Sequence, residues 1–417
     1  MAHPLFEKHR QLLEQALAAL ERRDGWNPYA DSAAYPDAEA GRQALDAYRG
    51  AQFYLDQPGL IDRVGEEASP YGLPLDISYP RCSHQILVAA AKAAAAAWLK
   101  AGPETRAGVC AEILAGLNAR VSEIGQAVMH TTGQSFPFAF HMGGPQAQVR
   151  GLEAVAAAYR EMSQVPPSAL WERGGVRIAK RFTVMPRGVA LVIASATSPL
   201  ATAYAGLFAS LATGNPVIVK PHPAAVLPLA ITVAVARQVL KQAGFEPDLV
   251  SLLVDAADAP IGRDVAVEPD VRIVDYVGTA DFGRWLEESA RQAVVFAQKA
   301  GVNCAVVDST DDYTGMLKCL AVALCLNSGQ LGTTPKVIFV PAAGVGTPAG
   351  GVDADAFGRD LAAAVGRLLD EPGRALDVLG ALRSPAVLAR LEAVAAAGDV
   401  LREPSALAHP QWPQALV

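Results

Sequence analysis

One lysine and one glycine-containing turn in this chain consist of residue types that can bind a nucleotide. Lys220 ends the apolar run of residues 216–220, and Gly278-Thr279 follows the apolar run of residues 271–277. A cation at the carboxyl end of a parallel strand lies where ligands bind in such sheets. Small residues let the backbone approach a pyrophosphate, and a helix N-terminus favours its negative charge. Alone, a lysine of this kind is more often a solvated side chain, and a glycine turn is more often a simple helix cap. The two features indicate a nucleotide site only if one sheet positions both.

The chain offers no clear nucleophile for covalent chemistry and no metal-ligand pattern. Cys319 and Cys325 lie in an apolar helical segment, where free cysteine usually acts as a small buried hydrophobe, and Cys304 lies in a strand-like run. No Gly-X-Ser-X-Gly elbow is present, and the histidines show no metal-ligand spacing. The odd, scattered set of cysteines gives no disulfide framework, which favours a reducing cytosol. We therefore expect no metal site and a cytoplasmic protein.

Composition excludes several classes of protein. Of the 417 residues, 51% are hydrophobic and 18% are charged, which is typical of a globular protein. The 35 basic and 42 acidic residues give a net charge of −7 without a basic run, which argues against nucleic acid and anionic membrane as partners. Residues 1–10 lack the apolar core of a signal peptide, and lysines interrupt the longest apolar segments, so no transmembrane helix is predicted.

The elements that must position Lys220 and the glycine turn alternate between strand and helix. Apolar runs predict strands at residues 188–194, 216–220, 249–254, 271–277 and 294–297, with helices at 204–211, 227–243 and from 282 onward. Such spacing favours right-handed crossovers, so we expect a doubly wound α/β sheet in a dinucleotide-binding domain at residues 177–300. Helical patterns at 5–22, 86–100, 105–121 and 151–162 predict a helical N-terminal region over residues 1–176.

Residues 301–417 are expected to form a second, incomplete α/β domain. Its predicted strands are residues 302–307 and 337–340, and its predicted helices are residues 357–369 and 386–397. A Gly/Pro-rich segment at 342–351 has no helix start at dinucleotide-binding spacing. We interpret that segment as a surface loop.

Three motifs resemble those of aldehyde dehydrogenases, in the right order along the chain. Gly329-Gln330-Leu331-Gly332 resembles the active-site motif Gly-Gln-X-Cys, with glycine at the position of the nucleophilic cysteine. The segment 214–221 resembles Gly-Asn-X-Val-X-X-Lys-Pro, and the segment 278–283 resembles Gly-Ser-X-X-X-Gly. In that family a thiolate attacks the aldehyde carbonyl. Glycine has no side chain with which to do so.

The resemblance implies a role for several positions. It places Lys220 against the adenosine ribose, Gly278 and Thr279 against the pyrophosphate, and Gly262 near the adenine. It places Gln298 at the position of the general base, although an amide cannot accept a proton near neutral pH. Thr197 falls at the position of the oxyanion asparagine, where its hydroxyl could donate one hydrogen bond. Two simpler interpretations stay open: Gln298 bonds backbone at a domain junction, and residues 197–198 cap the following helix.

Within the superfamily the chain is most similar to the phenylacetic acid degradation (PaaN-type) branch. Lys220-Pro221-His222-Pro223 and Asp308-Ser309-Thr310-Asp311-Asp312 carry this likeness. The branch implies oxidation of a ring-derived, small-molecule aldehyde to an acid with NAD or NADP, and it allows a homo-oligomer. Family members continue through a nicotinamide-binding segment and an oligomerisation strand, so we expect a C-terminally truncated member. The alternative is a catalytically silent protein that binds a nucleotide or a partner subunit.

Overall fold

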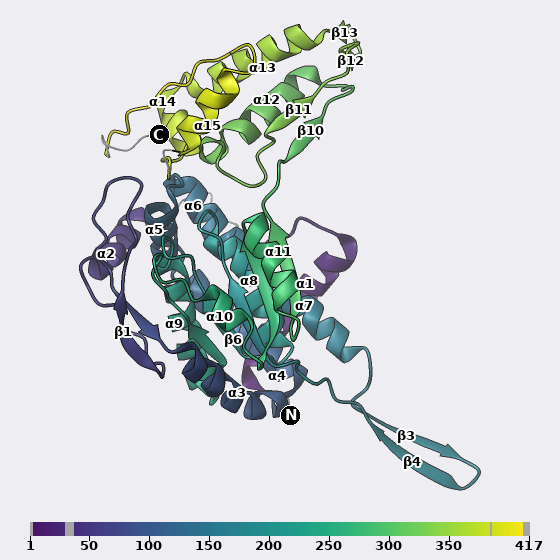
Figure 1. Ribbon diagram of the computed structural model, residues 1–417. Helices are drawn as coiled ribbons and strands as arrows, with labels where there is room; N and C mark the ends of the chain where they lie inside the picture. Colours follow the sequence, from purple (N-terminus) through teal and green to yellow (C-terminus); the bar gives the residue numbers. More distant parts are fainter. Residues whose placement is uncertain (1–2, 30–36, 384–385, 412–417) are drawn as a thin grey trace. The chain divides into compact units, whose positions relative to one another are not determined.

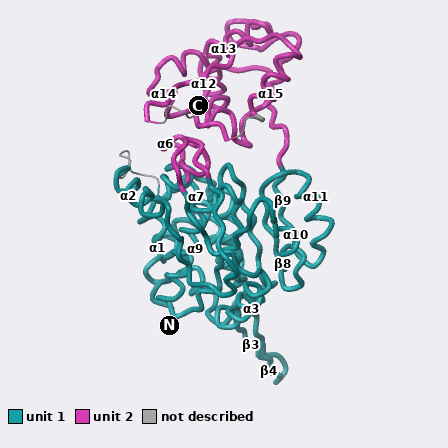
Figure 2. Tube along the Cα trace, turned by 60° about the vertical axis from the view of Figure 1, so that its left-hand side comes forward, with its two compact units in different colours: residues 1–67, 76–127, 140–299 teal, residues 68–75, 128–139, 300–417 magenta. Residues whose placement is uncertain are grey.

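The computed structural model describes residues 3–29, 37–383 and 386–411, and the chain divides into two compact units (Figure 1, Figure 2). Unit 1 comprises Met1–Glu67, Asp76–Ala127 and Phe140–Lys299, and unit 2 comprises Ala68–Leu75, Val128–Ala139 and Ala300–Val417. Most of the predicted helical N-terminal region, residues 1–176, therefore belongs to the same unit as the predicted dinucleotide-binding sheet. The reason is packing, because the N-terminal helices contact the helices of that sheet.

Unit 1 is built on a five-stranded parallel sheet with the order β7-β6-β5-β8-β9. The strands are β5 (Val189–Ile193), β6 (Val217–Lys220), β7 (Val250–Leu252), β8 (Val271–Gly278) and β9 (Val294–Lys299). The chain runs outward from β5 to β7 and then returns to place β8 on the other side of β5. This confirms the predicted doubly wound fold. In such sheets ligands bind at the carboxyl ends of the strands, near the point of reversal.

Helices cover both faces of the unit 1 sheet. They are α8 (Pro199–Ala212), α9 (Leu227–Gln242), η1 (Pro247–Leu249), α10 (Gly262–Ala266) and α11 (Ala280–Ser289). The N-terminal helices α3 (His84–Lys100), α4 (Gly102–Asn118) and α7 (Pro145–Ser163) pack on the sheet or its helices, and α1 (Pro4–Arg22) packs on α4 and α7. A further helix in residues 1–100 is α2 (Ala38–Tyr48). The predicted helix at 105–121 is wrong in its bounds, because the chain turns after Asn118 and starts α5 (Val121–Thr132), which α6 (Phe136–Gly143) follows.

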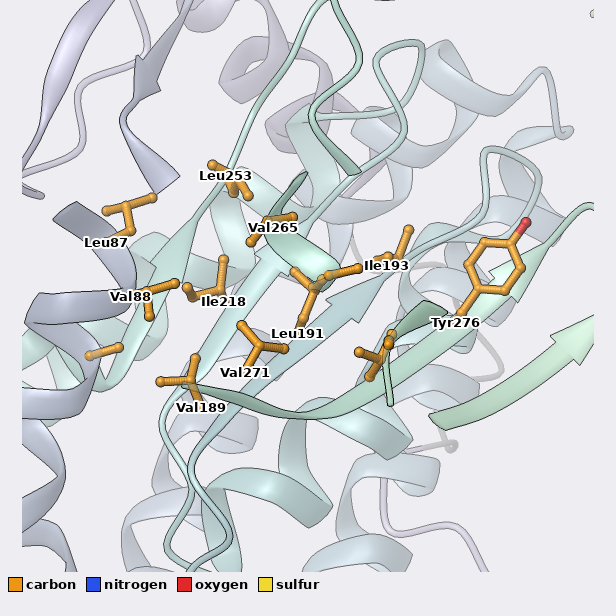
Figure 3. Packing of buried hydrophobic residues seen from close by; sticks show 14 of the residues in the cluster. Leu87, Val88, Val189, Leu191, Ile193, Ile218, Leu253, Val265, Val271 and Tyr276 are labelled. Carbon is orange, nitrogen blue, oxygen red and sulfur yellow. The ribbon is translucent and has the colours of Figure 1, made fainter. Parts of the chain in front are cut away.

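Successive side chains along a strand point to opposite faces of the sheet, which explains how both faces are buried. Val189, Leu191 and Ile193 of β5 point into a cluster with Leu87 of α3 and Val265 of α10 (Figure 3). The residues between them on β5 must point to the opposite face. There α8 contacts β5, β6 and β8. All five β5 residues are buried, as the continuous apolar run predicts.

Two antiparallel pairs in unit 1 lie outside the main sheet. The pair β3 (Ser168–Arg173) and β4 (Val176–Arg181) forms an exposed hairpin that projects from unit 1 (Figure 1). Residues 177–181, at the start of the predicted dinucleotide-binding domain, pair with β3 and not with the sheet. The second pair joins β1 (Leu60–Val64) to β2 (Tyr79–Cys82).

Unit 2 contains the second α/β layer. Strands β10 (Cys304–Val306) and β11 (Val337–Phe339) lie in the two segments predicted as strands, and they pair in parallel. The helical elements are α12 (Tyr313–Cys325), η2 (Leu326–Gly329), α13 (Ala354–Leu369), α14 (Pro372–Val378) and α15 (Ala386–Ala395). The segment predicted as a surface loop is instead the hairpin β12 (Val345–Thr347) and β13 (Gly350–Val352). Val345 is buried and packs with α12 and α13, which draws this segment into the unit 2 core.

Candidate dinucleotide site and the Gly332 pocket

Lys220 lies at the carboxyl end of β6 and forms a buried ion pair. Its Nζ donates to Asp255 Oδ1 at 2.7 Å, and the Ile261 backbone N–H donates to Asp255 Oδ2 at 3.0 Å. Asp255 follows β7, the strand next to β6, so the two side chains meet at one edge of the sheet. Sequence analysis missed Asp255. The available signal was an acidic residue directly after a predicted strand.

Gly262, at the start of α10, leaves room beside the Lys220 side chain. A Cβ at position 262 would lie 3.6 Å from Lys220 Cε and 3.4 Å from Phe282 Cζ. The structure thus brings together Lys220, Gly262 and α11. Arg263 lies next to Gly262 with its guanidinium 4.5 Å from the centre of the Trp285 ring. The described part of the chain therefore holds two cations and an aromatic pair at this edge of the sheet.

The glycine turn occupies the β8–α11 junction. Gly278 ends β8, and Thr279 is the N-cap of α11 without a side-chain hydrogen bond to the first turn. The Tyr276 hydroxyl donates to the Thr279 carbonyl at 3.0 Å, and any Cβ at Gly278 would collide with that hydroxyl. First-turn N–H groups that no cap side chain satisfies are suited to an anion. The residues present therefore fit a dinucleotide whose pyrophosphate lies at this turn.

Thr197 lies half-buried in the β5–α8 loop, one residue before the N-cap of α8. Ser198 occupies the N-cap position of α8, as the capping interpretation expects, but its side chain makes no cap hydrogen bond. Instead the Ser198 backbone N–H donates to Ser195 Oγ at 3.3 Å. The Thr202 hydroxyl donates to the Ser198 carbonyl at 2.8 Å. Ser195 and Thr202 thus shape the loop that presents Thr197.

Gln298 lies on β9, the edge strand of the unit 1 sheet, and is exposed. Its side chain makes no hydrogen bond to the residues that the structure describes. The interpretation that its amide bonds backbone at a domain junction stays a prediction. An amide at this position can donate and accept hydrogen bonds but cannot act as a base near neutral pH.

In unit 2 the motif before Gly332 adopts an unusual backbone. Asn327, Ser328 and Gly329 have successive positive φ angles of 52°, 51° and 69°. For non-glycine residues this conformation is uncommon and persists where surrounding contacts hold it. The Ser328 hydroxyl donates to the Gly380 carbonyl at 2.7 Å and accepts the Gly380 N–H at 3.1 Å. These bonds fix the turn that leads to position 332.

Gly332 faces an open pocket in unit 2. The pocket has a volume of about 300 Å³ and is lined by Gly332, Thr333 and residues 301–303. Asn303 Nδ2 donates to the Thr333 carbonyl at 2.6 Å, which ties the two lining segments together. A Cβ at position 332 would meet no heavy atom within 4 Å. A side chain would therefore fit there, and the thiol is absent only because the residue is glycine.

The cysteines do not replace that thiol in the pocket lining. Cys325 is buried, and burial raises the pKa of its thiol, so little thiolate is present near neutral pH. Cys304 is exposed at the start of β10, one residue after Asn303. Among the described residues no group of three or more His, Cys, Asp or Glu side chains could hold a metal ion.

No single helix in the described ranges is long and apolar enough to cross a membrane. The consecutive helices α3 and α4 reach that length and composition only when taken together, with a bend of 117° between them.

Comparison with known proteins gives the class to which this fold and these motifs belong. Residues 83–348 match the aldehyde dehydrogenase family, and the chain belongs to that family. The matched region includes the unit 1 sheet, Lys220, the glycine turn and the Gly332 pocket. The architecture is accordingly the aldehyde dehydrogenase fold, with a dinucleotide-binding domain and a catalytic domain.

Three relatives define the likeness more closely. The crystal structure of an NAD-dependent aldehyde dehydrogenase from Burkholderia multivorans is 45% identical, with a TM-score of 0.94 over all of this chain and 77% of that one. The NAD(+) benzaldehyde dehydrogenase of Pseudomonas putida is 27% identical, and the vanillin dehydrogenase of an Amycolatopsis species is 29% identical. Each match covers 44% of this chain, and the matched segments span only 38% and 36% of those two curated relatives.

Proposed function

We propose that this chain binds NAD and a small aldehyde but does not oxidise the aldehyde as the family does. The observation that carries the proposal is Gly332, which leaves a fitting but empty position where the family's motif has its thiol. Gln298 supports it, because an exposed amide replaces the carboxylate base. The loss of a nucleophile from a catalytic unit costs on the order of 10⁶ in kcat.

Dinucleotide binding is proposed to survive because its residues are present in unit 1. Lys220 and Gly262 would hold the adenosine half, and Gly278 with Thr279 would hold the pyrophosphate at the N-terminus of α11. NAD is favoured over NADP because the relative that matches the whole chain is described as NAD-dependent. When bound, NAD would supply a hydride acceptor, but this chain offers no thiol at position 332 to form the adduct that would donate the hydride. Thr197 would donate a hydrogen bond to the aldehyde oxygen.

The proposed ligand class is a ring-derived aldehyde. Relatives named for benzaldehyde and vanillin support an aromatic substrate, and the motifs shared with the phenylacetic acid degradation branch support an aldehyde from phenylacetate catabolism. A cytoplasmic location is proposed from the cysteines, none of which forms a disulfide in the described residues.

A rescue experiment tests the silent catalytic step. NADH formation would be measured with aromatic and aliphatic aldehydes for the wild-type chain and for Gly332→Cys/Gln298→Glu. We expect no turnover above background for the wild type and measurable turnover for the double variant, because position 332 has room for a thiol. Gly332→Ser/Gln298→Glu is the matched control, since a hydroxyl is a much weaker nucleophile than a thiolate.

Wild-type turnover at ordinary enzyme rates, on the order of 10 per second, would overturn the proposal. Alkylation followed by mass spectrometry would then identify the reacting thiol. Cys304 is the first candidate because it is exposed and follows Asn303 of the pocket, whereas Cys325 is buried.

A further inference from the structure

We propose that Asp255 makes this dinucleotide site select NAD over NADP, because its carboxylate cancels the charge of Lys220. The inference rests on the proposed function, since it concerns a residue at the same binding site. NADP differs from NAD by a phosphate on the 2′-hydroxyl of the adenosine ribose. A site accepts that phosphate by offering it a cation, and it favours the free hydroxyl by offering a carboxylate.

The ion pair between Lys220 and Asp255 is fixed in position. The Lys220 side chain is 9% exposed and the Asp255 side chain is 1% exposed. Both carboxylate oxygens of Asp255 are engaged, Oδ1 by the ammonium and Oδ2 by the Ile261 N–H. An ammonium held in this way keeps donors for neutral ribose hydroxyls. It offers no net positive charge to a phosphate.

The surroundings of the pair add negative charge. Asp258 is exposed between β7 and α10, Asp264 is exposed on α10, and Glu66 Oε2 accepts the Ala257 N–H at 2.9 Å. The nearby cations are Arg263, whose guanidinium stacks over the ring of Trp285 at 4.5 Å, and Arg81, which forms an ion pair with Asp62. Acidic groups therefore outnumber basic ones around the segment from Asp255 to Asp264. A 2′-phosphate, with a charge of about −2, is repelled by such a surface.

The sequence around Lys220 does not predict this preference for NAD over NADP. The residues that follow Lys220 directly are Pro221, His222 and Pro223, and none of them carries a carboxylate. The acid that reaches Lys220 comes instead from the end of the neighbouring strand, 35 positions later. Side-by-side pairing of β6 and β7 is what brings the two together.

The test compares binding of NAD⁺ and NADP⁺ by calorimetry to the full chain. The wild type should bind NADP⁺ at least about tenfold more weakly than NAD⁺. Asp255→Asn keeps the shape of the side chain but frees the charge of Lys220, so the ratio of the two Kd values should fall about tenfold through tighter NADP⁺ binding. Asp264→Asn is the matched control. It removes one nearby acid that does not contact Lys220, and the ratio should change by less than about twofold.

A double variant separates charge cancellation from other effects. In Lys220→Met/Asp255→Asn no ammonium remains to be freed, so the ratio should stay near that of the wild type. Far-UV circular dichroism would confirm folding of each variant, and Asp255→Ser replaces Asp255→Asn if the latter does not fold. Its hydroxyl can still accept the Ile261 N–H.

The possible results separate this inference from the proposed function. A wild-type chain that binds neither dinucleotide overturns the proposed function and this inference with it. A wild-type ratio near one, or an unchanged ratio in Asp255→Asn with NAD⁺ still bound, overturns the role of Asp255 and leaves dinucleotide binding intact.

Discussion

Asp275 is a carboxylate inside unit 1 that makes no hydrogen bond or ion pair with the described residues. It lies on β8 against α8, where any Cβ at Gly206 would collide with its carboxylate. Burial raises the pKa of Asp275 to about 6. A desolvated carboxylate with no partner destabilises the fold when it is ionised.

The raised pKa of Asp275 predicts a pH dependence of stability. Because its folded pKa of about 6 exceeds its usual 3.8, the native state binds more protons between these values, and stability falls as the pH rises through this range. Asp275→Asn cannot ionise, so it should stabilise the chain by roughly 1–3 kcal/mol near neutral pH and by less at about pH 4. Urea unfolding at both pH values would measure this.

Asp281→Asn is the control for Asp275→Asn. Asp281 is exposed on α11 and pairs with Arg284, so its loss should change the free energy of unfolding by less than about 1 kcal/mol at either pH. Equal stability of Asp275→Asn and the wild type at both pH values would show that the carboxylate is solvated.

At the scale of elements, the N-terminus of α9 depends on a residue far away in sequence. Its N-cap position is Val226, which has no capping side chain. Instead Glu67 Oε1 accepts the backbone N–H groups of Val226 and Leu227, the latter at 2.9 Å. Glu67 Oε2 accepts the Tyr79 hydroxyl. A carboxylate at this end of a helix is stabilised by the helix dipole as well as by the hydrogen bonds.

We expect Glu67→Gln to lower the free energy of unfolding by about 2 kcal/mol, because a buried charged acceptor becomes a neutral amide. Glu66→Gln is the matched control, since Glu66 is its exposed neighbour and, among the residues that the structure describes, accepts only the Ala257 N–H. Its cost should stay below about 1 kcal/mol. Similar unfolding midpoints for the two variants in guanidinium would contradict this role of Glu67.

The contrast between local and long-range features explains what could be predicted from the sequence. Strands β5, β6 and β8 follow from continuous apolar runs, and α9 follows from its helical period and the glycine at position 244. The Glu67 cap could not be predicted, because no local pattern marks a partner about 160 positions away. Asp255 differs, because its place directly after a predicted strand was a local signal, although its pairing with Lys220 depends on β6 and β7 lying side by side. The positions of Lys220 and Gly332 were predictable because short motifs mark them.

At the scale of the whole molecule, unit 2 presents an uncovered sheet face. Cys304, Val306, Val337 and Phe339 alternate along β10 and β11 and are all exposed. The residues between them, among them Ile338, face the unit 2 core. Exposed apolar faces and unpaired strand edges promote association.

We expect the purified chain to self-associate through the β10–β11 face. Val306 is 75% exposed and Phe339 is 55% exposed, so Val306→Lys/Phe339→Lys should put two charges on this face without disturbing the core. Light scattering after size-exclusion chromatography should show a concentration-dependent mass for the wild type and a smaller mass for this variant. Leu170→Lys, on the exposed hairpin of unit 1, is the matched control at 58% exposure. A monodisperse wild-type monomer would contradict this prediction, because the β10–β11 face would then be exposed to solvent without causing association. If only Leu170→Lys lost association, the contact between copies would lie at the hairpin. Repulsion between the introduced lysines would then have separated the copies.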